Sequence, residues 1–285
     1  ENRTTRLTVH GSESGNSHTH TNGQDVWVIK SRLCGRGFLD KQKWEVQRSS
    51  STASRISQRL AVSLAQLEKL EMELWDISNA FLQGLSFKEL YDRAAELGLE
   101  VKAQRDVLFR PPRNVWRHLN TLDSKTFRVE GHEDYLFILV LLKPMYGLVD
   151  APFLWGIALS IVLKRDLGGT PSLLNKDFYY WTERGHIVAV FTVHVDDVLA
   201  VGQQSFLDWA RQVLEEKFGD VKKQTLPFIH IGISYSRLQN GSMLLEQNEL
   251  VQRLKPIILT KHEKDHVDKA VSSEQTTAFR SLLCT

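Results

Sequence analysis

Residues 187–201 read IVAVFTVHVDDVLAV and are the most informative part of the chain. Two apolar runs, Ile187–Val193 and Val198–Val201, flank a short step that carries Asp196 and Asp197. Valine-rich runs of this length are typical of buried strands. A turn between two such strands would keep both carboxylates in water, so the stretch predicts two strands with an acidic junction.

Further strands and helices are predicted on both sides of this stretch. The strand signals are Met72–Ile77, 135–142, a hairpin of Phe178–Trp181 with Ile187–Val193 around Gly185, and a hairpin of Ile229–Leu238 with Ser242–Leu245 around Asn240-Gly241. The helix signals are Ser57–Glu71, Phe87–Leu97, a segment from Asp150 as N-cap to Arg165, Phe206–Phe218 and Gln247–Leu254. This mixture, with several hairpins, predicts the α+β class with an antiparallel sheet.

Composition excludes several classes of protein. The chain has 285 residues, of which 42% are hydrophobic and 25% charged, an ordinary globular balance. No apolar run reaches the roughly 18 residues that a membrane span needs, and the first residues show no secretory signal. Two cysteines, Cys34 and Cys284, cannot build a disulfide framework. We therefore expect an intracellular protein that is neither secreted nor embedded in a membrane.

The first sixty residues consist of a polar stretch followed by a basic segment. Residues 1–25 are rich in Thr, Ser, Gly, Asn and His and predict a flexible arm. From Lys30 to Arg59 the segment carries eight lysines and arginines against Asp40 and Glu45. Such a basic segment is consistent either with a solvated face or with a site for phosphate groups.

Asp196 and Asp197 have two readings. Aspartate is common in turns, because its side chain accepts hydrogen bonds from nearby backbone N–H groups. Carboxylates are also the ligands that magnesium prefers. Asp76 ends another apolar strand, and a third carboxylate on a neighbouring strand would allow the two-metal arrangement used in phosphoryl transfer.

Longer motifs narrow these alternatives. LWDISNAFLQG (74–84), LLKPMYGLVDAPFLW (141–155) and FTVHVDDVLAVG (191–202) occur in this order. Together they resemble the reverse transcriptase domain in the Pol polyprotein of copia-type LTR retrotransposons. VIKSRLCGRGF (28–38) is similar to the basic fingers motif of that family, and residues 228–254 and FRSLL (279–283) are similar to its later segments. The resemblance covers residues 26–285.

The resemblance implies a right-hand polymerase palm with a fingers subdomain and a partial thumb. Its limits would be a flexible arm at 1–25, a fingers-like basic segment at 26–75, a palm with interleaved fingers elements at 76–227, and a primer-grip hairpin with the start of the thumb or connection at 228–285. It implies an RNA-directed DNA polymerase that uses an RNA or DNA template with a primer and deoxynucleoside triphosphates. Its expected localisation would be intracellular, either in a cytoplasmic particle or in the nucleus.

The resemblance also assigns residues. Asp76, Asp196 and Asp197 match the catalytic aspartates, and with the Ile77 carbonyl they would hold two Mg²⁺ or Mn²⁺ ions. The nucleotide-contacting positions would be Phe81 under the sugar, Tyr146 and Gly147 in a loop against the nucleotide, and Lys30, Arg32 and Arg36 in the motif that contacts the triphosphate. Gly232 matches the glycine of the primer-holding hairpin, whereas its residue type alone predicts a bulge or a close strand contact.

Several positions depart from the family pattern. His194 stands where tyrosine is usual, Val149 and Asp150 replace a usual Lys-Gln, and Phe153 stands where a basic residue is common. Asp150 would add a negative charge close to the nucleotide. Three hypotheses follow: a reverse transcriptase, a silent or truncated remnant that at most binds nucleic acid, and an unrelated two-metal phosphoesterase such as a nuclease.

Overall fold

The structure is a computed structural model and describes residues 5–8, 13–21, 24–101, 104–127, 138–253 and 272–283. The chain divides into two compact units, Glu1–Lys223 and Gln224–Thr285. Helices and antiparallel sheets are mixed along the chain, which confirms the predicted α+β class.

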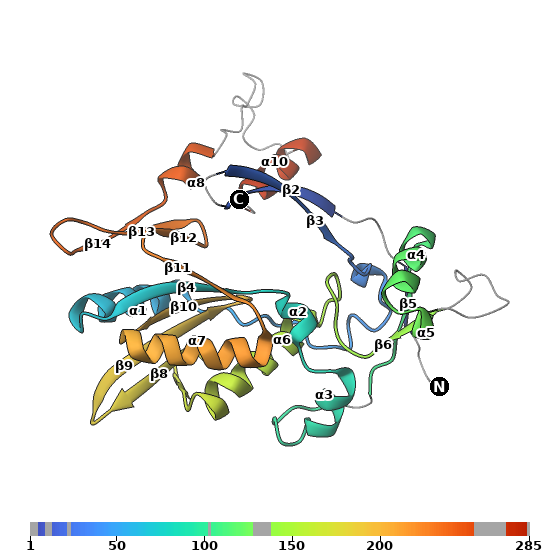
Figure 1. Ribbon diagram of the computed structural model, residues 1–285, viewed down its shortest axis with the longest axis horizontal. Coiled ribbons are helices and arrows are strands. Elements are labelled where there is room, and N and C mark those ends of the chain that lie inside the picture. Colours follow the sequence, from blue (N-terminus) through green and yellow to red (C-terminus); the bar gives the residue numbers. More distant parts are fainter. Residues whose placement is uncertain are drawn as a thin grey trace. The chain divides into compact units, whose positions relative to one another are not determined.

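The first unit is built on a six-stranded sheet in the order β11-β4-β10-β9-β8-β7 (Figure 1). Its strands are β4 (Glu71–Ile77), β7 (Thr170–Pro171), β8 (Phe178–Glu183), β9 (His186–His194), β10 (Asp197–Gly202) and β11 (Val221–Thr225). From β4 to β7 the neighbouring strands are antiparallel. The predicted hairpin of β8 with β9 and the two strands around the acidic step are confirmed.

Helices cover both faces of this sheet. α6 (Ala151–Ile161) and α7 (Gln204–Phe218) pack against the face that carries Trp75, Phe191 and Ala200. α1 (Arg55–Leu67) contacts β9 and β10 through its buried face. Because β10 is covered on both faces, Val198–Val201 is buried without a break, which explains why this segment reads as a continuous apolar run.

The core derives its stability from these buried side chains. Leu199, Leu207 and Leu214 are fully buried, and burying a leucine contributes roughly 1.5–3 kcal/mol. Aromatic side chains interlock in the same core, with Trp75 edge-on to Phe191 at 5.0 Å between ring centroids. The sheet and the ends of its strands therefore form a rigid frame.

Two smaller groups of strands include residues 5–8 and 13–21, which show no strand signal in the sequence. β1 (Thr5–Thr8) pairs in parallel with β5 (Val107–Arg110), and β6 (Leu139–Leu141) pairs antiparallel on the other side of β5. β2 (Glu13–Thr21) forms a hairpin with β3 (Gln24–Arg32). Strand pairing uses backbone groups, which polar residues carry as well as apolar ones, so a polar composition concealed these strands.

The remaining helical elements of this unit are short, and several of them were not predicted from the sequence. They are α2 (Ala80–Gln83), α3 (Phe87–Arg93), α4 (Arg113–Leu122), α5 (Ser124–Phe127), the 3₁₀ turn η1 (Gly37–Leu39) and the π-helical turn η3 (Val162–Asp166). The prediction for 87–97 was too long, since α3 gives way to turns that end at Gly98 with φ +67°. The prediction for 150–165 holds only if η3 is counted with α6. Of the strand predicted at 135–142, residues 135–137 lie outside the described residues.

The second unit contains the sheet β12-β13-β14, formed by Phe228–His230, Ile233–Arg237 and Met243–Glu246. The predicted strand 229–238 is wrong as one piece, because Ile231 and Gly232 have φ of +51° and +70° and turn the chain. Gly232 therefore lies in a tight turn and not in a bulge. β13 and β14 form the hairpin predicted around Asn240-Gly241, with a loop longer than two residues. Helices α8 (Asn248–Arg253) and α10 (Ser273–Leu283) follow.

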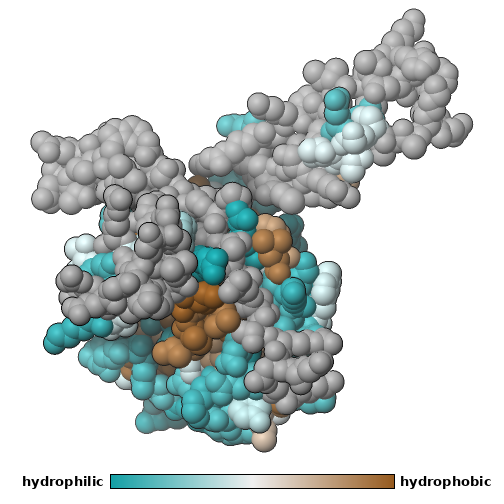
Figure 2. Space-filling view, turned by 90° about the vertical axis from the view of Figure 1, so that its right-hand side faces the viewer, coloured by the Kyte–Doolittle hydropathy of each residue, from teal (hydrophilic) through white to brown (hydrophobic). Residues whose placement is uncertain are grey.

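Some apolar side chains remain at the surface. Val140 and Leu142, at the edge strand β6, are 56% and 76% exposed. Figure 2 shows the side of the molecule on which β5 and β6 are drawn in Figure 1, with apolar side chains grouped among hydrophilic ones. None of the helices among the described residues is long and apolar enough to cross a membrane.

Candidate functional site

The site begins where β4 ends and β10 begins. In the antiparallel register of these two neighbouring strands, Asp76 lies directly opposite Asp197. Asp197 also lies opposite His194 on β9, and Asp196 belongs to the turn between β9 and β10. Opposed residues on antiparallel strands have Cβ atoms about 4.5–5.5 Å apart, so the fold brings the predicted aspartates together from distant parts of the chain.

The turn that carries Asp196 is held in an uncommon conformation. Val195 has φ +59°, and a β-branched residue rarely adopts this left-handed region. Three hydrogen bonds stabilise it. The Val195 N–H donates to the Ser51 carbonyl at 2.7 Å, the Trp155 indole N–H donates to the Val195 carbonyl at 2.7 Å, and the Ile77 N–H donates to the Asp196 carbonyl at 3.4 Å.

The residues that hold the turn come from three places. Ser51 lies in an extended segment before α1, whose next residues Thr52 and Ala53 pair with the end of β9. Trp155 is fully buried in α6, and Ile77 ends β4. Backbone strain of this kind persists only where the surroundings fix it, and it is frequent at functional sites.

Electrostatics at the turn favour the protonated form of one carboxyl. Burial, together with the neighbouring charges of Asp196 and Asp76, raises the pKa of Asp197 to about 6. Each of these contributions acts in the same direction. Burial lowers the pKa of half-buried His194, while the charge of Asp196 opposes that shift. A cation at this place would relieve the repulsion among the three carboxylates.

The donor chemistry of the three aspartates fits hard divalent cations. Carboxylate and carbonyl oxygens are the ligands that magnesium and manganese prefer. In the part of the chain that the structure describes, no three His, Cys, Asp or Glu side chains converge as a ready ligand set. The fit therefore rests on the backbone placement of Asp76, Asp196 and Asp197 and on the electrostatics of Asp197.

A second group of predicted residues meets around Tyr146. The rings of Phe81, in α2 just after β4, and Tyr146 are 5.5 Å apart. The backbone of Tyr146 accepts a hydrogen bond from the Gly35 N–H at 2.7 Å, and Gly147 accepts one from the Gly37 N–H at 3.1 Å. The two loops thus touch through their backbones.

Glycine is required at this contact. A Cβ atom on Gly147 would lie 2.1 Å from the Gly35 carbonyl oxygen, and one on Gly37 would lie 2.1 Å from the Gly147 carbonyl oxygen. Gly147 also has φ +87°, which favours glycine. Arg36 sits between Gly35 and Gly37 and is therefore carried to the Tyr146 loop. Lys30 and Arg32 lie in β3, and their side chains are outside what the structure describes.

Asp150 does not behave as predicted. It stands at the N-cap position of α6, but its side chain makes no capping hydrogen bond. It is buried and forms an ion pair with Arg105 at 2.9 Å, and the same guanidinium contacts buried Asp40. The Asp150 carboxylate is therefore paired within this buried cluster and does not cap the helix.

Arg105 is a residue that the sequence did not single out. It connects Asp40, which follows η1, with Asp150 at the start of α6, and so it braces the two segments that contact each other at Tyr146. Burial raises the pKa of Asp150, Arg105 opposes that shift, and Asp40 adds to it. A single arginine just before β5 carries no spacing signal that would have revealed this role.

Two cavities lie away from the aspartates. One of about 420 Å³ is lined by parts of α6 and β8 together with Ser49 and Ser51. Another of about 410 Å³ is lined by residues 45–47, 99–101 and 104–105 and the start of α6. Phe153, which stands where the resembling family commonly has a basic residue, lines both cavities.

Comparisons with known proteins found no family model that matches the chain and no matching curated protein. The functional assignment therefore depends on the motifs and on the geometry of the site.

Proposed function

We propose that this chain is the reverse transcriptase domain of a copia-type retrotransposon, with a polymerase palm, fingers elements and a partial thumb. The observation that carries the proposal is the register of β4 and β10, which sets Asp76 opposite Asp197 beside the Asp196 turn. Two-metal nucleotidyl transfer needs carboxylates on neighbouring elements within reach of the same ions.

The proposed roles come from the family resemblance, and the placement of the residues is compatible with them. Asp76, Asp196 and Asp197, with the Ile77 carbonyl, would hold two Mg²⁺ or Mn²⁺ ions. When bound, such ions activate the primer 3′-hydroxyl and stabilise the leaving pyrophosphate. No protein nucleophile is needed, so the carboxylates act by binding and orienting.

The second group of residues would receive the nucleotide. Phe81 offers an aromatic face beside Tyr146, suited to packing under the sugar of a deoxynucleoside triphosphate. Arg36, brought to the same loops by the glycine contacts, would contact the triphosphate together with Lys30 and Arg32 from β3. Template and primer would be bound mainly through phosphates, so their affinity should fall steeply with salt.

Primer extension on an RNA template tests the proposal. The assay contains deoxynucleotides and Mg²⁺ or Mn²⁺, and compares the protein with Asp196→Asn and with Asp92→Asn, a surface carboxylate on α3. We expect extension that Asp196→Asn lowers by about a thousandfold or more, because a metal-binding charge is lost while the shape is kept. Asp92→Asn should extend normally.

Other outcomes separate the alternatives. No extension by a folded chain that still binds template and primer would favour the silent remnant. Metal-dependent shortening of the primer without nucleotide-dependent extension would favour a nuclease. Undiminished synthesis by Asp196→Asn would remove the two-metal assignment.

A further inference from the structure

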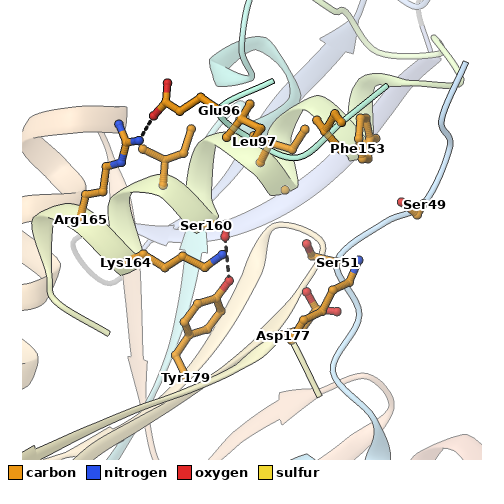
Figure 3. Close-up of a pocket in the computed structure, with 15 residues that line it drawn as sticks. Ser49, Ser51, Glu96, Leu97, Phe153, Ser160, Lys164, Arg165, Asp177 and Tyr179 are labelled. Atoms are coloured by element: carbon orange, nitrogen blue, oxygen red, sulfur yellow. Dashed lines mark hydrogen bonds and ion pairs between the residues drawn. The ribbon is translucent and has the colours of Figure 1, made fainter. Parts of the chain in front are cut away.

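The cavity of about 420 Å³ has a wall of mixed chemistry (Figure 3). Leu97, Phe153 and Ile157 give it an apolar side. Ser160 and Tyr179 give it a hydroxyl side, and the Tyr179 O–H donates to Ser160 Oγ at 3.0 Å. The Ser160 hydroxyl proton is therefore available to a further acceptor, such as the oxygen of an anion.

Some charged side chains that line the cavity have interaction partners in the structure, and others have no carboxylate partner among the residues that the structure describes. Arg165 is paired with Glu96, and the Asp177 carboxylate accepts the Thr52 N–H at 3.0 Å. Lys164 and Lys176 also line the cavity, and within the described residues neither has a carboxylate partner. Figure 3 shows the Lys164 side chain extending toward Ser160 and Tyr179. The lining of the cavity thus includes two lysines, a hydroxyl donor and an apolar surface.

The same wall supports the aspartate-bearing turn. Ser51 lines the cavity, and its carbonyl accepts the Val195 N–H at 2.7 Å. Asp177 also lines it, and its carbonyl accepts the Val193 N–H at 2.9 Å. A Cβ on Gly156 of α6 would lie 2.6 Å from Ser51 Oγ, so α6 fixes Ser51 closely. A molecule in the cavity would press on residues that hydrogen-bond directly to the end of β9 and to its turn.

We propose that this cavity binds an organic anion with a flat apolar body, and that binding is felt at the Val195–Asp196 turn. The anionic group lies between Lys164, Lys176 and Ser160, and the apolar body lies against Leu97, Phe153 and Ile157. The volume is in the range of sites for small organic molecules. This inference stands apart from the proposed polymerase activity, because it depends on the wall and on the hydrogen bonds to the turn.

A matched pair of fluorescent probes tests the binding site. 8-Anilinonaphthalene-1-sulfonate carries the anionic group, and N-phenyl-1-naphthylamine has the same apolar body without it. In the Lys164→Glu/Lys176→Glu variant, we expect the anionic probe to bind about tenfold or more weakly and the neutral probe to bind within about twofold of the parent protein. Lys222→Glu, on β11 outside the cavity, is the control and should change neither affinity.

Two outcomes would overturn the binding site. Equal affinities of the anionic probe for the parent protein and the double variant would show that the lysines do not bind the anion. Equal losses for both probes would show a general loss of the cavity. Lys164→Gln/Lys176→Gln removes charge without reversing it, and circular dichroism identifies any variant that fails to fold, so the charge effect is measured on a folded protein.

The connection to the turn has its own readout. The Trp155 indole N–H donates to the Val195 carbonyl, so its NMR signal reports on the turn. This signal is identified among the seven tryptophans by its loss in Trp155→Phe. We expect the anionic probe to shift it in the parent protein and not in the double variant. An unchanged signal at saturating probe, or the same shift in the double variant, would overturn the connection.

Discussion

Two regions of the first unit bring carboxylates together, and their surroundings treat those carboxylates in opposite ways. Asp40 and Asp150 are buried around Arg105, whose guanidinium contacts both. At the β9–β10 turn, Asp76 and Asp196 add to burial in raising the pKa of Asp197. At Asp150, burial also raises the pKa, but Arg105 opposes it.

The difference agrees with a structural role for the first group and with the proposed metal-binding role for the second. A buried charge that serves only the fold is normally accompanied by an opposite charge, because an isolated one is costly. Like charges beside a strained turn have no such partner in their own group, and the proposed binding of cations would supply one, since carboxylate oxygens are ligands that magnesium prefers. The predictions below break each arrangement in turn.

The largest effect is expected from Arg105→Ala. It leaves Asp40 and Asp150 buried without their common cation, and breaking a buried pair in this way costs about 3–5 kcal/mol. Urea unfolding at neutral pH measures the loss, and Arg105→Lys should show a smaller one because it keeps the charge without the planar fork. A change below about 1 kcal/mol would mean that the cluster does not support the fold.

Trp155→Phe should lower the unfolding free energy by about 2 kcal/mol, because a buried ring shrinks and the Val195 carbonyl loses its donor. Primer extension should fall as well. Trp181→Phe is the matched control, since its indole N–H donates to the Leu167 carbonyl at 2.6 Å, away from the turn. We expect a similar loss of stability there with extension retained, and equal activities of the two variants would contradict a special role for Trp155.

Asp197→Asn should stabilise the protein at pH 8 by about 1–2 kcal/mol, after allowance for solvent screening. The carboxyl has a pKa of about 6 in the folded chain against 3.8 as the reference, so the folded state favours its protonated form. Its ionisation therefore lowers the unfolding free energy as pH rises from about 3.8 to about 6.

Thermal unfolding of both proteins across this pH range measures the effect. The advantage of Asp197→Asn should be absent below pH 3.8 and complete above pH 6. Added Mg²⁺ should reduce it by stabilising the parent protein. A variant that is less stable than its parent at pH 8 would show that Asp197 is a structural carboxylate like Asp150.

The smallest effect is expected at an exposed ion pair. Lys88→Ala removes the partner of Asp92 on the surface of α3 and should change the unfolding free energy by no more than about 0.5 kcal/mol. The same unfolding assay measures it. A loss comparable with that of Arg105→Ala would mean that burial does not distinguish the two pairs.

Much of the first unit could be predicted because periodicity follows burial. β10 is covered on both faces and gave an unbroken apolar run, and α7 is covered on one face and gave a helical pattern. β2 has neither signal, since its pairing with β3 depends on backbone groups. The loop of the β13–β14 hairpin was also missed, because a favourable Asn-Gly pair does not fix the register of the strands around it.

The residues of the candidate site also differ in whether the sequence alone could reveal them. The aspartates follow apolar runs, and the structure brings Asp76 and Asp197 opposite each other. It also brings Phe81 and Tyr146, which only the resemblance singled out, close together. Arg105 was missed, because an ion pair that joins distant segments has no periodicity. The role of Asp150 was wrong for a related reason: the sequence shows a good N-cap residue but not the guanidinium that competes for it.

The order of strands in the central sheet has a consequence for synthesis of the chain. β4 lies between β10 and β11, and both neighbours follow it by more than a hundred residues. At about 5–20 residues per second, β4 leaves the ribosome on the order of ten seconds before its first partner strand. During that interval Met72, Leu74 and Trp75 have no strand beside them, so the nascent chain carries an aggregation-prone segment until the acidic turn has been made.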